Sequence, residues 1–230
     1  MLDGSPALPA TLSNLAMVYR DTGEPSKAEP LMRRALALAD GPLEVARLWN
    51  NLAGVYETEG RYPESEELYR KSLQARERLL GSEHRDTISS LHHLASVIAW
   101  QGRYTDAEPL LRRALEIGGS NAAILDDLGF VAAHTGRVEE AERCYRTAVE
   151  SIERERGERS RDLLPALANY TALLRDLGRK REAARLEARA RDIRAEDMRT
   201  NALGLTLDLK TRRAIQARIP ATGAQPAASK

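Results

Sequence analysis

The stretch LHHLASVIAWQGRYTDAEPLLRRAL, residues 91–115, decides the fold because it contains two helical patterns separated by one glycine. Apolar residues of the first half recur at i, i+3, i+4 and i+7, which is one face of a helix: Leu91, Leu94, Ala95 and Ile98. Gly102 then supplies the left-handed backbone conformation that ends a helix at little steric cost. The stretch therefore predicts two helices joined by a tight turn.

The same pattern occurs five times in register. The other four copies are residues 12–36, 49–73, 125–149 and 167–191. The turn glycines are Gly23, Gly60, Gly102, Gly136 and Gly178, with spacings of 37, 42, 34 and 42 residues. Small residues recur on both helices, where they allow close approach of the two backbones: Ala16, Ala53, Ala95, Gly129 and Thr171 on the first, and Ala28, Ser65, Ala107, Ala141 and Ala183 on the second.

The composition suits a folded helical chain. Hydrophobic residues make up 42% of the 230 residues and charged residues 30%, whereas aromatic residues are only 4%. No apolar run reaches the roughly 18 residues of a membrane span, and we recognise no secretory signal. Cys144 is the single cysteine, so no intrachain disulfide is possible. We therefore expect a cytoplasmic protein.

The charge is balanced overall but uneven along the chain. The net charge is +1, while residues 199–230 hold six Lys and Arg against one Asp. This basic segment has no aromatic residues on which bases could stack. We expect no nucleic-acid partner, because the balanced chain as a whole does not favour electrostatic capture of phosphates.

The repeated residues resemble the tetratricopeptide repeat (TPR) family: a large apolar residue, Leu and a small residue, then Tyr, Gly, Ala, an aromatic and Ala-Leu. The 42-residue spacing and the linker LLGSEHRDT resemble the long-repeat subclass found in kinesin light chains and many bacterial proteins. Ile98, Ala132 and Leu174 depart from this pattern because they replace the usual Tyr. The resemblance implies an all-α solenoid of about five helix-turn-helix repeats that forms a right-handed superhelix with a concave groove.

We expect the solenoid to occupy residues 1–198. A single helix pair cannot bury its apolar face alone, so stacked pairs should share a continuous core. The expected repeats are approximately 8–40, 45–80, 87–118, 121–156 and 163–198. Residues 199–230 are expected to form a basic C-terminal capping segment and a short irregular, flexible tail, because the pattern is broken at Gly204 and Pro, Gly, Ala and Ser follow Pro220.

The resemblance also implies which side chains face the groove, since the first helix of each pair lines the concave surface in this family. The predicted groove residues lie between the apolar positions of the first helices: Asn14, Met17, Arg20, Arg47, Asn50, Asn51, His92, His93, Ser96, Trp100, Asp126, Asp127, Phe130, His134, Asn169 and Arg175.

A polar dyad recurs at one place in each first helix. The dyads are Ser13-Asn14, Asn50-Asn51, His92-His93, Asp126-Asp127 and Ala168-Asn169. Asparagine offers both donors and acceptors, so a row of such dyads can bind the main chain of an extended peptide. Kinesin light chains use groove asparagines in this way, which makes Asn14, Asn50, Asn51 and Asn169 candidates by resemblance. The alternative is that they are ordinary solvated side chains.

Three large apolar residues are also predicted to face the groove. Trp100, Phe130 and Met17 are suited to hold anchor side chains of a partner. The alternative for Trp100 is that it packs on the next helix pair.

The histidines and aspartates raise the question of chemistry. Adjacent helical residues point about 100° apart, so His92 and His93 are poorly placed to share one metal ion, and no H-E-x-x-H spacing occurs. We therefore expect neither a metal nor another cofactor. A hydrogen bond between a histidine of the third repeat and an aspartate of the fourth is the stronger expectation, and it would make binding sensitive to pH.

The sequence contains no recognisable catalytic constellation. There is no G-x-S-x-G, P-loop or G-x-G-x-x-G motif, and Cys144 has no histidine at helical spacing. We expect no enzyme and no catalytic residues. The leading hypothesis is a protein-interaction module that binds an extended peptide or partner helix of unknown identity. The alternative is a structural unit that self-associates through its solenoid ends.

Overall fold

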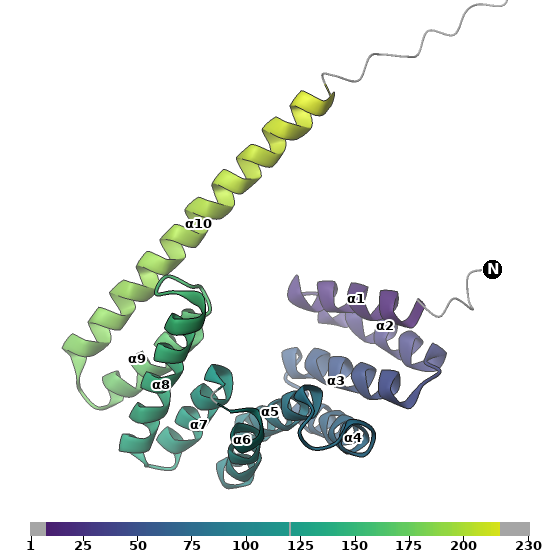
Figure 1. Cartoon of the computed structure of the whole chain (residues 1–230), viewed down its shortest axis with the longest axis horizontal. Helices are drawn as coiled ribbons and strands as arrows, with labels where there is room; N and C mark the ends of the chain where they lie inside the picture. Colours follow the sequence, from purple (N-terminus) through teal and green to yellow (C-terminus); the bar gives the residue numbers. More distant parts are fainter. Residues whose placement is uncertain (1–7, 120, 217–230) are drawn as a thin grey trace, which may run out of the picture. The chain divides into compact units, whose positions relative to one another are not determined.

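The computed structural model describes the backbone of residues 8–119 and 121–216, and the side chains of these residues as far as Thr200. Within this part the chain forms ten helices and no strand (Figure 1). They are α1 (Leu8–Asp21), α2 (Pro25–Leu38), α3 (Pro42–Thr58), α4 (Tyr62–Leu80), α5 (Arg85–Trp100), α6 (Tyr104–Gly118), α7 (Ala122–His134), α8 (Val138–Arg156), α9 (Leu163–Asp176) and α10 (Lys180–Gln216). None of the described helices is long and apolar enough to cross a membrane.

The helices pack as consecutive pairs, which confirms the predicted all-α repeat fold. The chain divides into two compact units, residues 1–155 and 156–230. In the first unit, α1 packs on α2, α3 on α4 and α5 on α6, and each pair also contacts the next. In the second unit, α9 packs on α10.

The turn glycines adopt the conformation that the sequence predicts. All five have φ between +73° and +80°, a region that other residues enter only with strain. At the end of α3, the Gly60 N–H donates to the Glu57 carbonyl and the Arg61 N–H donates to the Tyr56 carbonyl. These bonds satisfy the last carbonyls of the helix and reverse the chain into α4.

The small residues lie between the paired helices, also as predicted. Ser65 on α4 donates from Oγ to the Ala53 carbonyl on α3 at 2.9 Å. On α7, a Cβ added to Gly129 would lie only 2.7 Å from the Tyr145 ring of α8. A larger side chain at Ala53 or Gly129 would therefore keep the second helix from packing as closely on the first.

A charged ladder that sequence reasoning missed links the second helices of the first unit. An arginine directly after the turn glycine of one repeat pairs with a glutamate on the second helix of the preceding repeat. The three pairs are Arg61 with Glu29 at 3.0 Å, Arg103 with Glu66 at 2.9 Å and Arg137 with Glu108 at 2.7 Å. Each glutamate also pairs with an arginine four residues later: Arg33, Arg70 and Arg112.

The repeat pattern in the sequence breaks at Gly204, but the backbone stays helical there. Helix α10 runs without interruption from Lys180 to Gln216 and includes this glycine. A lone glycine costs a helix only about 1 kcal/mol relative to alanine, and its neighbours are mostly Leu, Ala, Asp and Lys. The capping role of residues 199–230 stays a prediction, and the flexible segment expected after Pro220 lies outside the described residues.

Candidate functional site: the first-helix face

Side chains of α1, α3, α5 and α7 form one hydrogen-bonded row across the first unit, which we call the first-helix face. The first member of each dyad bonds the second member of the next dyad, so the row is diagonal. The bonds are Asn51 Nδ2 to Ser13 Oγ (3.0 Å), His93 Nδ1 to Asn50 Oδ1 (3.3 Å) and His92 Nε2 to Asp127 Oδ2 (3.0 Å). The expected histidine–aspartate bond between repeats three and four is therefore present.

The two adjacent histidines have different surroundings. The His93 ring stacks on Tyr69 with centroids 5.3 Å apart. Burial, together with the nearby charges of His92 and Arg76, lowers the pKa of His93 to about 4. The ring is consequently neutral at pH 7, and its Nδ1 carries the proton because the Asn50 carbonyl oxygen can only accept. His93 is thus a structural part of the row.

Asp127 joins His92 to Ser96. Ser96 Oγ lies within hydrogen-bonding reach of the Asp127 carboxylate and of the His92 carbonyl, the latter at 3.0 Å. The order is serine–aspartate–histidine, whereas activation of a serine nucleophile requires the imidazole beside the hydroxyl. This arrangement fixes the side chains and does not activate Ser96.

Glu57 is a carboxylate enclosed in the same face. Burial raises its pKa, opposed by a 2.8 Å hydrogen bond from the Tyr69 hydroxyl and by the charge of Arg20. Arg20 reaches toward α3 over Gly54, where an added Cβ would lie 3.1 Å from Arg20 Nη1. Sequence reasoning missed the role of Tyr69, because a tyrosine at this position reads as core.

The large apolar candidates fall into two environments. Trp100 is 47% exposed, and its ring centroid lies 6.0 Å from that of Tyr62 in the preceding pair. Phe130 is half-buried, with its ring 4.1 Å from His134 and 6.0 Å from Tyr104. Trp100 is thus exposed, whereas Phe130, Tyr62 and Tyr104 are partly buried. Tyr62 and Tyr104 were missed, although both occur in a GRY sequence.

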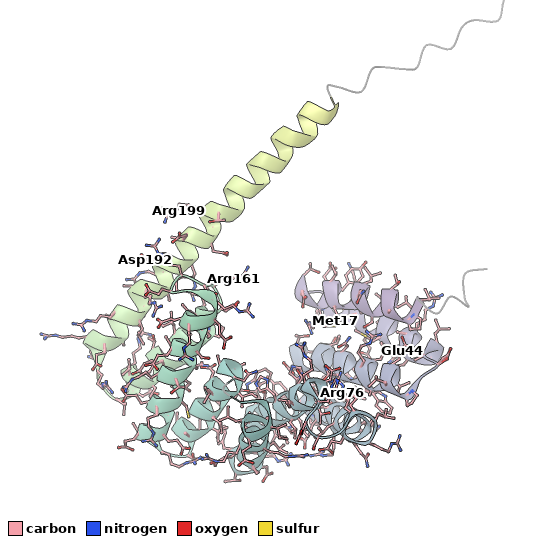
Figure 2. All side chains as sticks on the ribbon, viewed as in Figure 1. Met17, Glu44, Arg76, Arg161, Asp192 and Arg199 are labelled. Carbon is pink, nitrogen blue, oxygen red and sulfur yellow. The ribbon has the colours of Figure 1, made fainter. Side chains whose placement is uncertain are left out.

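The remaining candidates are less tightly linked. Met17 packs against the apolar core of the first two repeats (Figure 2), and Arg47 pairs with Glu44 at 3.5 Å. Asn14, His134 and Arg175 are exposed, while Asp126 and Asn169 are partly buried. Asn169 and Arg175 belong to the second unit, where Arg175 pairs with Glu187 at 2.6 Å.

The arrangement offers hydrogen bonds rather than metal ligands. In the described part of the chain, no group of three or more His, Cys, Asp or Glu side chains is arranged to hold a metal ion. Burial also raises the pKa of the Cys144 thiol, which disfavours the reactive thiolate.

Solved structures show the same fold. A putative kinesin light chain of Podosopora anserina with nearly identical TPR-like repeats is 22% identical over 84% of this chain and 98% of that one, with a TM-score of 0.67. BtubC (BKLC) from P. vanneervenii is 22% identical over 98% of this chain and 87% of that one, also at 0.67. YrrB, a TPR protein with an unusual peptide-binding site, is 20% identical over 81% and 87%, at 0.50.

Comparison with family models gives the assignment. No curated protein matches this chain. Two models described as tetratricopeptide repeat match it, one over residues 44–118 and 120–196 and the other over residues 10–39. Because these segments span more than half of the 230 residues, and because the helix pairs and turn glycines follow the same plan, the chain belongs to the tetratricopeptide repeat family.

Proposed function

We propose that this chain is a non-catalytic protein-interaction module that binds an extended peptide along the first-helix face. The observation that carries the proposal is the diagonal row of hydrogen bonds. The row fixes the Asn50 and Asn51 side chains through one end of each amide. Side chains held in place before binding lose less entropy when a ligand arrives.

The free ends of the two amides complement a peptide backbone. Asn50 uses its oxygen in the row and Asn51 uses its nitrogen. Among the described residues, no partner occupies the Asn50 nitrogen or the Asn51 oxygen. Asn50 therefore offers donors to a peptide carbonyl, and Asn51 offers an acceptor to a peptide N–H. Such main-chain bonds give affinity for an extended segment of varied sequence.

Trp100 supports an anchoring role beside this row. Its side chain is about half exposed, and the exposed part is suited to contact an apolar side chain of the peptide. In a Trp49→Phe background, Trp100 is the remaining tryptophan, so its fluorescence reports on the peptide directly. We expect the emission to shift on binding. Binding without any change in emission contradicts the anchoring role.

The decisive test is selection of peptides from a random displayed library against the full chain. Peptides that bind the wild type should lose binding to the Asn50→Ala, Asn51→Ala, Trp100→Ala triple variant. The matched control is Gln74→Ala, an exposed position on α4. Selection of no peptide, or equal binding by the triple variant, rejects the proposal. Light scattering over a range of concentrations then tests the alternative of self-association.

A further inference from the structure

Helix α1 exposes two apolar side chains at positions that the later repeats of the first unit bury. Leu15 and Val18 are 44% and 56% exposed. Helix α1 is the outermost first helix of this unit, with α2 and α3 packed against it (Figure 1). The equivalent side chains of α3, α5 and α7 are at most 4% exposed: Leu52 and Val55, Leu94 and Val97, and Leu128 and Val131. The face that those helices bury is therefore open on α1.

The buried equivalents show what normally covers this face. Leu52 and Val55 belong to one apolar cluster with Met32 and Ala35 of the preceding second helix, α2. Each repeat of the first unit thus shields this face of the repeat that follows it. On α1, none of the described residues buries the same apolar surface, which favours its burial against a partner.

The arginine–glutamate ladder argues against another repeat as that partner. At the junctions of the first unit an arginine follows the turn glycine and pairs with a glutamate of the preceding repeat, as Arg61 does with Glu29. In the first repeat Glu24 follows the turn glycine instead, and it pairs with Lys27. A ladder glutamate of a preceding repeat would therefore meet a like charge. The C-terminal end of a second copy offers no better match, because its fifth repeat has Ala184 at the position of the ladder glutamate.

The exposed stripe of α1 is complementary to itself. Thr11, Leu15, Val18 and Thr22 are all exposed and follow one another at intervals of four, three and four residues. Thr22 directly follows α1, and its N–H still donates to the Val18 carbonyl at 2.9 Å. The intervals are those of a coiled-coil seam, and they read the same in both chain directions. Two antiparallel copies of α1 therefore place Leu15 opposite Val18 of the second copy, and Thr11 opposite Thr22 of the second copy.

Charge does not oppose this pairing. The charged residues of α1 are Arg20 and Asp21, which pair with each other at 2.7 Å. The stripe itself carries no charge at any of its four positions. Two copies can thus bring it together without burying an unpaired charge, whose cost would otherwise oppose association.

We propose that the chain forms a two-fold dimer in which this face of α1 packs against the same face of a second copy. A two-fold axis needs a surface that matches itself, which the stripe provides. Because each copy contributes one short helix, the interface is small, and we expect a dissociation constant on the order of micromolar. The stripe shares no residue with the hydrogen-bonded row of the first-helix face, so dimer formation and peptide binding can be tested independently.

Analytical ultracentrifugation of the full chain over a concentration series tests the dimer. The wild type should shift from the mass of one chain to that of two as the concentration rises through the micromolar range. Leu15→Glu together with Val18→Glu should remove the shift, because like charges would be buried at the centre of the interface. The matched control is Leu79→Glu, which alters an exposed leucine of α4 and should keep the dimer. A wild type that stays monomeric, or a dimer that survives the double substitution, overturns the proposal.

Cross-linking tests the antiparallel geometry without relying on the glutamate variants. In a Cys144→Ser background, chains with Thr11→Cys should form disulfides with chains carrying Thr22→Cys. Chains with Thr11→Cys alone should not, because the antiparallel pairing separates their two cysteines by about 16 Å along the helix axis, which is beyond the reach of a disulfide. Non-reducing electrophoresis reads the result. Efficient cross-linking of the Thr11→Cys chains alone, or none in the mixture, overturns the two-fold pairing.

Discussion

Arg103 holds Glu66 across a repeat junction, with its Nη1 2.9 and 3.1 Å from the two carboxylate oxygens. Arg70 and Gln101 donate to the same carboxylate at 2.6 and 2.7 Å, and the Glu66 side chain is only 9% exposed. Burial raises the pKa of Glu66, but the hydrogen bonds from Gln101, Arg70 and Arg103 outweigh it and hold the pKa below its ordinary value.

Glu66→Gln is expected to lower the free energy of unfolding by about 2 kcal/mol at pH 7, because a buried charge-assisted bond is lost while its donors stay in place. Chemical denaturation measures the change. The neighbouring Glu67, 66% exposed and paired with Lys71, is the control, and Glu67→Gln should cost less than about 0.5 kcal/mol. The Glu66 contribution should fade as pH falls through its lowered folded-state pKa. Equal effects of the two variants would contradict the ladder's role.

Glu57→Gln should raise the free energy of unfolding at pH 7, in contrast to Glu66→Gln, which should lower it. Burial raises the pKa of Glu57, so its charged form costs stability at pH 7, whereas Gln keeps an acceptor for Tyr69. We expect a gain on the order of 1 kcal/mol in the free energy of unfolding. The gain should shrink as pH falls and Glu57 takes up its proton in the folded state. Glu116→Gln, at an exposed position on α6, is the control, and destabilisation by Glu57→Gln at pH 7 would refute the prediction.

His93 should make stability depend on pH. Its pKa is lowered to about 4 in the folded protein, so the unfolded chain binds more protons between about pH 4 and the ordinary value near 6.5. The free energy of unfolding should therefore fall by about 3 kcal/mol as pH drops through this window. His93→Asn removes the titrating group and should flatten the slope. His134→Asn, at an exposed site, should leave it unchanged; a flattened slope in that variant as well would assign the effect elsewhere.

Alanine substitutions at two glycines of the first helices should change the free energy of unfolding in different ways. Gly129→Ala places a Cβ 2.7 Å from the buried Tyr145 ring, so we expect a loss of about 1–3 kcal/mol in the free energy of unfolding. In Gly54→Ala the contact is with Arg20 Nη1 at 3.1 Å, the end of a flexible side chain that can move aside. The higher helix propensity of alanine, about 1 kcal/mol, should then leave Gly54→Ala neutral or stabilising. Thermal melts of both variants check the order.

The helix pairs and their turns were predictable because they depend on local pattern. The periodicity around Leu91 and the left-handed turn at Gly102 each need only a few neighbouring residues. The uninterrupted helix through Gly204 was not predicted, because summed helix propensity outweighs one unfavourable residue.

Pairing between repeats was less accessible to sequence reasoning. The dyads were visible, but whether Asn50 meets His92 or His93 depends on the axial offset between stacked helices, which no local pattern records. The arginine–glutamate ladder has the same origin, since Arg103 and Glu66 are 37 residues apart. Phe130 was assigned to the open face, yet its contacts with Tyr104 and His134 depend on how α6 approaches α7.

The diagonal row has a consequence for exchanging repeats between proteins. Each dyad serves two different neighbours, so its halves belong to separate junctions: Asn50 is matched to His93 and Asn51 to Ser13. A transplanted repeat brings only one partner of each inter-repeat hydrogen bond. At both of its junctions it then faces a residue that does not match. The unit that can be exchanged is therefore the junction, with the facing halves of two neighbouring helix pairs. Chains recombined at the turns between repeats should contain unmatched hydrogen-bond partners at each new junction.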